Sequence, residues 1–421
     1  MTNMKKLFTT ENLIIAAVIF AAIFFAKFPT LYNWLNTPKG YWYPKSTSWF
    51  DAWDTNFQVS YIRYGQRYGL ALQNTYTTTP HKPVFIYQYY TGLGVANRLL
   101  KLDPFILFHL ASIITSIILI LVSYFICRLF VKDTLYRISA FIIIVLGGGF
   151  AWVPYLSFSA DNKIAGFTLV NALERGHDAF ITFITLLTFI FMYLYMKVPN
   201  RKYIIWASLA GIIGMTFHPP MLGLYLGTAG ILAFIHYIEN KKIRLFGLPV
   251  ILSLAFIVYG LLVLSDLFGS PGFTGVVGQN LFNADSLSLF LGFGFLSPFI
   301  FWSLIREEKS REIFFLKVFF LIQLFFLFLP SGFHLYYAKG LFVWGVLLGI
   351  YGITSLISNL KIQRIVLTFV VVTSLMTRVH IFGNLIDAKL NNPFFFLTKS
   401  EGEAIGFMSS LPKDSGILSL Y

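Results

Sequence analysis

Long apolar stretches alternate along this chain with short polar turns that contain many of its lysines and arginines. Each stretch approaches the ~20 residues with which a helix crosses a hydrocarbon core. A backbone in lipid must satisfy its own hydrogen bonds, and the two-residue alternation of barrel strands is not seen in this sequence. We therefore predict an all-α polytopic membrane protein with about eleven transmembrane helices, at residues 12–31, 105–130, 136–155, 179–197, 203–217, 220–238, 246–265, 286–305, 312–330, 339–358 and 364–380.

The charges in the turns predict how these helices are oriented. Basic residues favour the cytoplasmic side during membrane insertion, so the N-terminus is expected in the cytoplasm and the chain in the cell (plasma or inner) membrane. The short outer loops then contain only Lys163, Arg175 and Lys339. The cytoplasmic turns contain Lys5, Lys6, Arg128, Lys132, Arg137, Lys197, Arg201, Lys202, Lys241, Lys242, Arg244, Arg306, Lys309, Arg311, Lys361 and Arg364.

The composition agrees with a membrane location. Of the 421 residues, 57% are hydrophobic and 12% are charged, whereas a soluble globular domain has roughly 25% charged residues. The net charge of +14 does not indicate nucleic-acid binding, because the positive charges gather at the ends of the predicted helices. The single cysteine, Cys127, lies in an apolar stretch and has no partner for an internal disulfide.

Two segments are predicted to lie outside the membrane. The first, at residues 32–104, is too long for a simple connection, and within it an aromatic face at helical spacing predicts a helix lying in the membrane interface: Phe57, Tyr61, Tyr64, Tyr68 and Leu72. We expect a transmembrane domain at 1–380 and an outer tail at 381–421, which is either the start of a truncated soluble domain or a short appendage. In the tail we expect a helix at 401–410, a turn at 412–416 and a strand start at 417–421.

Ionisable residues gather near the outer ends of the predicted helices. Such residues are costly to desolvate in a membrane, and each is a functional candidate for that reason. They come from parts of the chain that are far apart in sequence: Asp51, Asp54, His81, Glu174, Arg175, His177, Asp178, His218, His334, Lys339, Arg378 and His380.

The plan of one helix, a large outer loop that opens on carboxylates, and then many helices resembles the GT-C superfamily of integral-membrane glycosyltransferases. The stretches 54–63 (Asp-Thr-Asn-Phe…Tyr-Ile-Arg) and 76–83 (Tyr-Thr-Thr-Thr-Pro-His-Lys-Pro) look like those of uncharacterised multi-span bacterial members. That group is distantly similar to glycosyltransferase family 39, which includes protein O-mannosyltransferases and lipid A aminoarabinose transferases. The plan covers nearly the whole chain, and the local motifs are short.

The resemblance implies an inverting transfer of a sugar from a polyprenyl-phosphate donor to an acceptor at the outer face of the cell envelope. It implies that Asp54 is the general base, with Asp51 as the second choice. It also implies that basic side chains neutralise the phosphate leaving group, which carries a developing negative charge. The residues expected to bind substrate or phosphate are His81, Arg175, His177, His218, Lys339 and Arg378. A divalent metal ion is one further expectation, with Glu174 and Asp178 as its ligands.

Each candidate also has a purely structural interpretation. Asp54 precedes a helical pattern and would serve as its N-cap. Glu174 and Asp178 are four residues apart and would form an ordinary ion pair with Arg175 on one helical face. Lys339 and Arg378 would extend toward the interface as basic side chains at helix ends commonly do. Gly147, Gly148 and Gly149 end the third predicted span and indicate close packing or a local break in the helix.

The main alternative function is a membrane transporter, or a flippase for lipid-linked sugars, without catalysis. Transporters usually place ionisable residues at mid-membrane and have related halves. Most predicted spans here lack central charges, and no duplicated half is seen in the sequence. A polysaccharide polymerase or ligase shares the many-helix plan, but those enzymes generally have their large outer loop late in the chain. Glycosyl transfer is therefore the favoured hypothesis.

Overall fold

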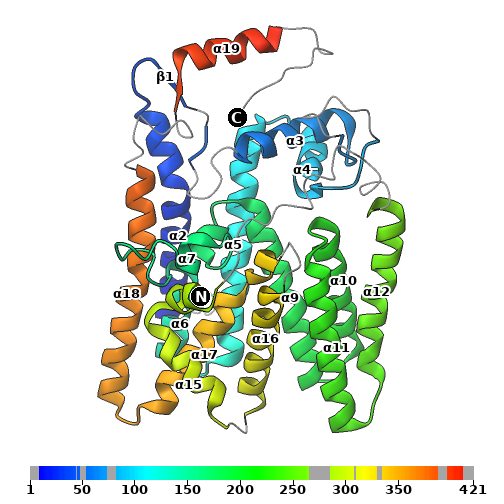
Figure 1. Ribbon diagram of the computed structural model, residues 1–421, viewed down its shortest axis with the longest axis vertical. Coiled ribbons are helices and arrows are strands. Elements are labelled where there is room, and N and C mark those ends of the chain that lie inside the picture. The colour runs from blue at the N-terminus through cyan, green and yellow to red at the C-terminus, as the bar shows by residue number, and fades with distance from the viewer. Residues whose placement is uncertain are drawn as a thin grey trace, which may run out of the picture.

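The helices of the protein lie mostly side by side along one long axis in the computed structural model, which describes residues 9–43, 45–47, 54–73, 82–264, 285–307, 310–329, 334–386 and 396–410 (Figure 1). Within these residues the only paired strands are the two-residue β1 (Tyr41–Trp42) and β2 (Leu397–Thr398). The prediction of an all-α polytopic membrane protein is confirmed.

Each of the eleven predicted spans coincides with a helix or with consecutive helices. Among the described residues, six helices are long and apolar enough to cross a membrane, by length and composition alone. The spans correspond to α2 (Thr10–Leu35), α5 (Pro104–Phe130), α6 (Thr134–Leu146), α9 (Gly176–Lys197), α10 (Arg201–Phe217), α11 (Met221–Asn240), η1 with α12 and η2 (Arg244–Phe246, Gly247–Tyr259, Gly260–Leu264), α14 with η4 and α15 (Ser286–Phe293, Gly294–Leu296, Ser297–Ile305), α16 (Arg311–Phe328), α17 (Leu341–Leu356) and α18 (Leu360–Ile386).

The third predicted span, 136–155, is wrong at its end. Helix α6 stops at Leu146, and the three glycines that follow lead into an irregular loop with the short helices α7 (Ala160–Lys163) and α8 (Leu169–Ala172). A Cβ atom on Gly149 would lie 2.1 Å from the carbonyl oxygen of Leu291 in α14. The glycines therefore allow both the local break and the close packing that the sequence indicated.

A buried carboxylate holds this loop in place. Asp161 is fully buried and accepts hydrogen bonds from the backbone N–H groups of Gly149 at 2.7 Å and Ala151 at 3.2 Å. It also accepts from the hydroxyl groups of Ser159 at 2.6 Å and Thr377 in α18 at 2.9 Å. Four donors compensate the lost hydration of the carboxylate. Asp161 therefore fastens the loop between α6 and α9 to α18.

The segment at 32–104, which is predicted to lie outside the membrane, contains a pair of helices at one end of the bundle, α3 (Asp54–Tyr68) and α4 (Gln88–Leu100). We call this the α3–α4 end (Figure 1). Tyr61 and Ile62 of α3 are buried in a cluster with Tyr90 of α4 and Phe108 of α5. The prediction of an aromatic helix is correct, but part of its apolar face packs on protein instead of facing lipid. Leu72 lies beyond the helix and bridges to Val84.

The tail returns to the N-terminal part of the chain. Strand β2 pairs antiparallel with β1, and helix α19 (Lys399–Ser410) confirms the predicted helix at 401–410. Gly402 of α19 packs against the ring of Trp42. The predicted turn at 412–416 and strand start at 417–421 lie outside the described residues. The proposed boundary between a transmembrane domain at 1–380 and a tail stays a prediction.

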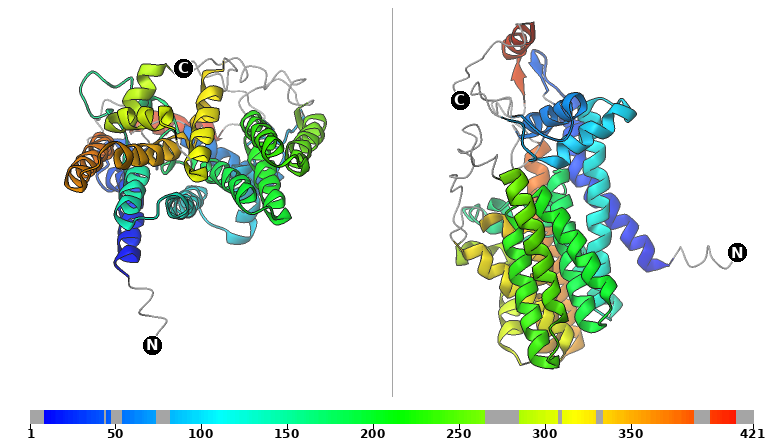
Figure 2. Two further views of the ribbon diagram at one scale, coloured as in Figure 1. Left: turned by 90° about the horizontal axis from the view of Figure 1, so that it is seen from below. Right: turned by 90° about the vertical axis from the view of Figure 1, so that its right-hand side faces the viewer.

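Helices α10, α11 and α12 lie side by side at one edge of the bundle, and Figure 2 shows the start of α2 leaning away from the others. The outer face of α12 and of η2 after it is strongly apolar, with Leu254 and Val258 of α12 and Leu261 of η2 more than half exposed. An apolar groove of about 430 Å³ runs between α10 and α12 and is lined by Ile212, Met215, Thr216, Leu254, Ala255, Val258, Tyr259 and Val263.

The predicted cytoplasmic turns meet at the end of the bundle opposite α3 and α4. Ion pairs join the ends of different helices there, between Lys197 and Glu312 at 3.2 Å and between Arg311 and Glu239 at 2.7 Å. The grouping of the turns agrees with the predicted alternation of the helices. Which end faces the cytoplasm stays a prediction.

The packing of Gly149 against α14 leads to a test of the loop. Replacement by alanine (Gly149→Ala) should cost roughly 2 kcal/mol of stability, because the added Cβ overlaps the Leu291 carbonyl. Gly230→Ala in α11 is the control, since a Cβ there meets nothing within 4 Å. Apparent Tm of the purified protein in detergent should fall by several degrees for the first variant only. Equal Tm values would contradict this packing.

Candidate functional site

Asp178 is the centre of a buried group of charges at the α3–α4 end. It lies in the first turn of α9 and is 2% exposed. Its carboxylate pairs with the guanidinium of Arg175 at 2.7 Å and with the ammonium of Lys339, which precedes α17. Arg175 is 6% and Lys339 1% exposed. Ions this deeply buried are stable only when they are paired and hydrogen-bonded, so these three side chains form one unit.

The surrounding backbone determines where the Lys339 side chain lies. Gln323 of α16 donates hydrogen bonds to the carbonyl oxygens of Tyr337 at 3.1 Å and Lys339 at 2.9 Å, which holds η5 (His334–Ala338) and the turn after it against α16. Gly166 has a φ of +78°, and a Cβ on it would lie 3.1 Å from the Lys339 nitrogen. A side chain at 166 would therefore displace the lysine from Asp178.

Asp54 reaches this group from α3. It is the first residue of that helix, and its carboxylate lies 3.6 Å from the guanidinium of Arg175. Its side chain is 40% exposed, whereas that of Arg175 is 8% exposed. A carboxylate in a first helical turn also interacts favourably with the helix dipole. Asp54 thus retains a local structural role, and the contact with Arg175 brings it to the charge group as well.

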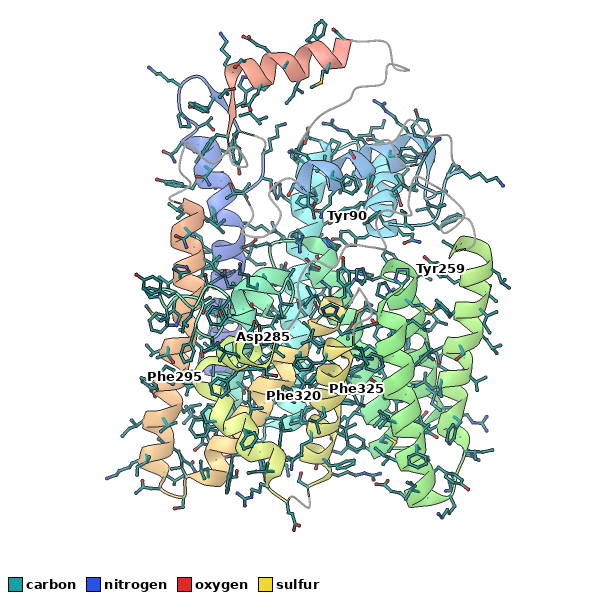
Figure 3. All side chains as sticks on the ribbon, in the orientation of Figure 1. Tyr90, Tyr259, Asp285, Phe295, Phe320 and Phe325 are labelled. Carbon is teal, nitrogen blue, oxygen red and sulfur yellow. The ribbon has the colours of Figure 1, made fainter. Side chains whose placement is uncertain are left out.

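His177 connects the charge group to α4. The Tyr90 hydroxyl hydrogen-bonds to Nδ1 of His177, and Nε2 lies 3.5 Å from the Asp178 carboxylate. Burial raises the pKa of Tyr90 well above its usual value, so its hydroxyl stays protonated. When this hydroxyl donates to Nδ1, the ring hydrogen is on Nε2 and points toward Asp178. Figure 3 shows Tyr90 at the α3–α4 end.

His218 completes the group from the turn between α10 and α11. Its ring packs edge-on against Tyr336 with centroids 4.3 Å apart, and the Lys339 nitrogen lies 5.8 Å from the Tyr336 ring. Burial and the nearby Lys339 lower the pKa of His218 to about 3, so the imidazole is neutral near pH 7. Its buried Nε2 has no hydrogen-bond partner among the described residues. A neutral ring of this kind is able to bind a polar group of a ligand.

Glu174 and Arg378 belong to a second group that lies beside the first. The Glu174 carboxylate attracts Arg378 of α18 and Lys27 of α2. Arg378 donates to the carbonyl oxygens of Val170 and Ala22, both at 3.0 Å. Lys27 donates to the Glu174 carbonyl at 2.7 Å. These bonds hold the backbone directly before Arg175. Arg378 is therefore a neighbour of the charge group, and among the described residues its hydrogen bonds go to Val170 and Ala22 rather than to Asp178.

The expected metal ligands do not assemble. Glu174 precedes α9, so it does not share a helical face with Asp178 as the sequence spacing suggested. Asp178 is engaged by Arg175 and Lys339, and Glu174 interacts with Lys27 and Arg378. Among the described residues no three histidine, cysteine or carboxylate side chains come together in a way that suits a metal ion. These residues do not fit a metal centre, and we derive no chemical step through one.

The described residues thus place five of the sequence candidates in one group: Asp54, Arg175, His177, Asp178 and Lys339, with His218 adjacent. Asp51 and His81 lie outside the described residues. Sequence reasoning did not identify Tyr90, Asp161 or Lys27. Tyr90 is one of many tyrosines in the chain, and nothing in its local sequence distinguishes it.

Fold and site together define a polytopic, all-helical membrane protein with a buried polar group at one end. No model of a protein family matches the sequence, and a search of the curated proteins found no match. Among solved structures, the crystal structure of ArnT from Cupriavidus metallidurans in the apo state aligns with a TM-score of 0.44 and 12% identity. The alignment covers 78% of this chain and 71% of that chain. Similarity this low does not assign an activity.

Removal of the central carboxylate should be costly. Asp178→Asn leaves Arg175 and Lys339 buried without their counter-charge, and we expect a loss of about 3–5 kcal/mol of stability. Glu312→Gln, at an exposed ion pair of the opposite end, is the control and should cost less than about 1 kcal/mol. Denaturant unfolding in detergent micelles measures both. A loss for Asp178→Asn as small as for the control would show that the buried pairing is not formed.

The neutral His218 leads to a test by pH. Its pKa is about 3 in the folded protein and about 6.5 in the unfolded chain. Between these values the unfolded state binds more protons, so acidification below pH 6.5 destabilises the folded state. His218→Gln should therefore lose less Tm than the wild type between pH 7 and pH 5. Identical slopes for the two proteins would contradict the burial of this ring.

Proposed function

We propose that this protein is an inverting glycosyltransferase that moves a sugar from a polyprenyl-phosphate carrier to an acceptor hydroxyl at the outer face of the membrane. The observation that carries the proposal is the convergence of Asp54, the pair Arg175 and Asp178, and Lys339 from three distant segments at one end of the bundle. Such a group supplies a partly exposed carboxylate beside buried cations. The proposed reaction requires both, the carboxylate as general base and the cations to neutralise the leaving phosphate.

The balance of charge supports an anionic ligand. Among the described residues of the two groups, the buried cations Arg175, Lys339 and Arg378 and the partly buried Lys27 outnumber the buried carboxylates of Glu174 and Asp178. Adding the half-exposed carboxylate of Asp54 still leaves the positive charges of these residues in excess of the negative ones. A phosphate entering beside Lys339 would compensate the excess, and the neutral His218 would be available to hydrogen-bond to it. The same cations stabilise the negative charge that develops on the phosphate as the sugar leaves.

Asp54 supplies the base in this mechanism. Its carboxylate takes the proton of the acceptor hydroxyl while that oxygen attacks the anomeric carbon of the sugar. The bond between this carbon and the phosphate oxygen breaks, and the electron pair leaves with the carrier phosphate. Attack from the face opposite to the leaving group inverts the anomeric centre. The contact with Arg175 orients the carboxylate of Asp54 toward the charge group. Asp51 is the second candidate for the general base.

The apolar groove between α10 and α12 supports a lipid-linked donor. Tyr259 lines the groove, and its hydroxyl donates to the carbonyl oxygen of Phe85 in the first outer segment at 3.2 Å. Thr216, also in the lining, is two residues before His218. An isoprenoid chain in this groove would bring its phosphate toward His218 and Lys339, while the apolar lining replaces lipid around the chain.

Transport without catalysis is the outcome to be excluded. Lys27 and Arg378 are charged residues within candidate spans, as transporters often have. In this structure, however, they bond to Ser112 and to backbone carbonyls of neighbouring segments. A counterflow assay in liposomes with labelled undecaprenyl-phosphate glucose would detect passage of the donor across the bilayer without formation of product.

The role of Asp54 is tested by the removal of its charge. Asp54→Asn should lower the rate of sugar transfer at least about 100-fold, because a general base is lost. The assay uses purified protein in nanodiscs, ¹⁴C-labelled undecaprenyl-phosphate hexoses and envelope extract as the source of acceptor. Asp51→Asn is assayed in parallel and should retain most of the activity.

Asp103→Asn is the matched control for a capping role. Asp103 caps α5 at the same end of the bundle, and its carboxylate accepts from the N–H groups of Phe105 at 2.9 Å and Ile106 at 3.3 Å. Removal of this charge should leave the transfer rate within about twofold, since asparagine still caps the helix and any cost falls on stability. Full activity in both Asp54→Asn and Asp51→Asn would overturn the mechanism.

A further inference from the structure

Tyr87 has a backbone conformation that tyrosine rarely adopts. Its φ is 56° and its ψ 33°, in the left-handed region, where a Cβ atom crowds the following carbonyl oxygen. It precedes α4 as the N-cap residue, but its side chain forms no capping hydrogen bond. Local strain of this kind persists only where the surrounding structure enforces it, and it is frequent at functional sites. The helix start alone does not explain a tyrosine at this position.

The ring of Tyr87 lies at the edge of the charge group. It packs against Tyr61 with centroids 5.1 Å apart and an interplanar angle of 34°, and edge-on against Phe57 at 6.0 Å. Tyr61 is 2% exposed and supports the ring from within the protein, whereas Tyr87 itself is 40% exposed. The phenol is also within electrostatic range of Asp54 and Tyr336. Tyr87 thus lies near both the candidate base and Tyr336.

We propose that Tyr87 is a specificity-determining residue on which the transferred pyranose stacks. This inference rests on the proposed glycosyl transfer and names the group that would hold the sugar. Because Tyr61 and Phe57 support the ring within the protein, its exposed part is available to the C–H groups on one face of a neutral pyranose. The sugar hydroxyl groups would then face the polar side chains near Asp54. The left-handed backbone turns the tyrosine toward this position.

A binding experiment separates the sugar from the carrier. Full-length protein in nanodiscs is titrated with undecaprenyl phosphate, and separately with undecaprenyl-phosphate glucose, galactose and mannose. For at least one of the three sugars, the wild type should bind the sugar-bearing carrier about three- to tenfold more tightly than the bare carrier. Tyr87→Ala should abolish this increment and leave the affinity for undecaprenyl phosphate unchanged, whereas Tyr87→Phe should retain it.

Tyr155 provides the matched control. It also has a positive φ, of 69°, and is 95% exposed. It lies in the loop between α6 and α7 and forms no hydrogen bond, ion pair or ring contact with a described residue of the charge group. Tyr155→Ala should therefore leave both affinities unchanged. An equal loss of the increment in Tyr155→Ala would assign the effect to general instability and would overturn the proposal.

A comparison of two variants at the same position tests the strain separately. Tyr87→Ala and Tyr87→Gly both remove the ring, but only glycine adopts the left-handed conformation without cost. The glycine variant should melt roughly 1–3 °C above the alanine variant, and both should lose the sugar increment equally. Such a pattern shows a strained tyrosine kept for its ring. A sugar increment retained in the glycine variant would contradict the stacking role.

The remaining outcomes are distinct. Binding of bare and sugar-bearing carriers with equal affinity by the wild type would overturn the role of Tyr87 while leaving the phosphate site and the proposed transfer intact. A wild type that binds none of the carriers, although it is folded by its Tm, would overturn the proposed function, and with it the inference on Tyr87. If Tyr87→Ala still binds the sugar-bearing carrier more tightly than the bare carrier, the role of Tyr87 is contradicted and the proposed transfer is unaffected.

Discussion

The burial of Asp178 between Arg175 and Lys339 is the interaction on which the rest of the site depends. An ion removed from water loses several kcal/mol of hydration, and only close, well-oriented partners compensate that loss. The partners of Asp178 come from the residues before α9 and from the turn before α17, and Asp54 of α3 and Tyr90 of α4 join through Arg175 and His177. The helix pair α3 and α4 therefore docks onto charges that the helical bundle already pairs, through the contact of Asp54 with Arg175 and the hydrogen bond between Tyr90 and His177.

The loop between α6 and α9 transmits this constraint to the remaining helices. It is fastened to α18 through Asp161 and Thr377, and its last residues are held by Lys27 of α2 and Arg378 of α18. The result is an irregular segment with almost fixed ends, which presents Arg175 to Asp54 and Asp178. Irregular backbone at this depth is tolerated only where protein groups replace water. The cations of the second group satisfy carbonyl oxygens, and this gives them a structural role that does not depend on any ligand.

Much of this architecture was predictable, and the failures have physical causes. Apolar runs long enough for a bilayer identify helices directly, so each of the eleven predicted stretches contains a helix, whereas the end of α6 was missed because the apolar run continues beyond Gly149. The clustering of Asp54, Arg175, His177, Asp178 and Lys339 at one end of the bundle followed from the predicted alternation of the helices, since alternate turns of a membrane bundle share one side. The alternation of the helices did not predict which of these side chains pair with one another. The sequence spacing of Glu174 and Asp178 suggested a shared helical face, but the helix begins at Gly176, and each carboxylate turns to a different pair of cations. Tyr90 and Asp161 were missed because their roles arise only from contacts across the fold.

The distribution of strain and polarity favours the proposed site for chemistry over a pathway for transport. A transport pathway requires polar groups along the depth of the bundle, whereas the central packing of this molecule is dominated by apolar side chains such as Phe189, Phe319 and Trp344. Three features instead meet at one end of the bundle: the charge group around Asp178, the strained Tyr87 and the start of the apolar groove. A ligand that is apolar along most of its length and charged at one end would match both environments at once. Its charged end would displace little water, because Arg175 and Lys339 are already desolvated and oriented before it arrives. Preorganisation of this kind lowers the cost of stabilising a developing charge, and it explains why a buried ion group whose formation is expensive would be kept in the fold.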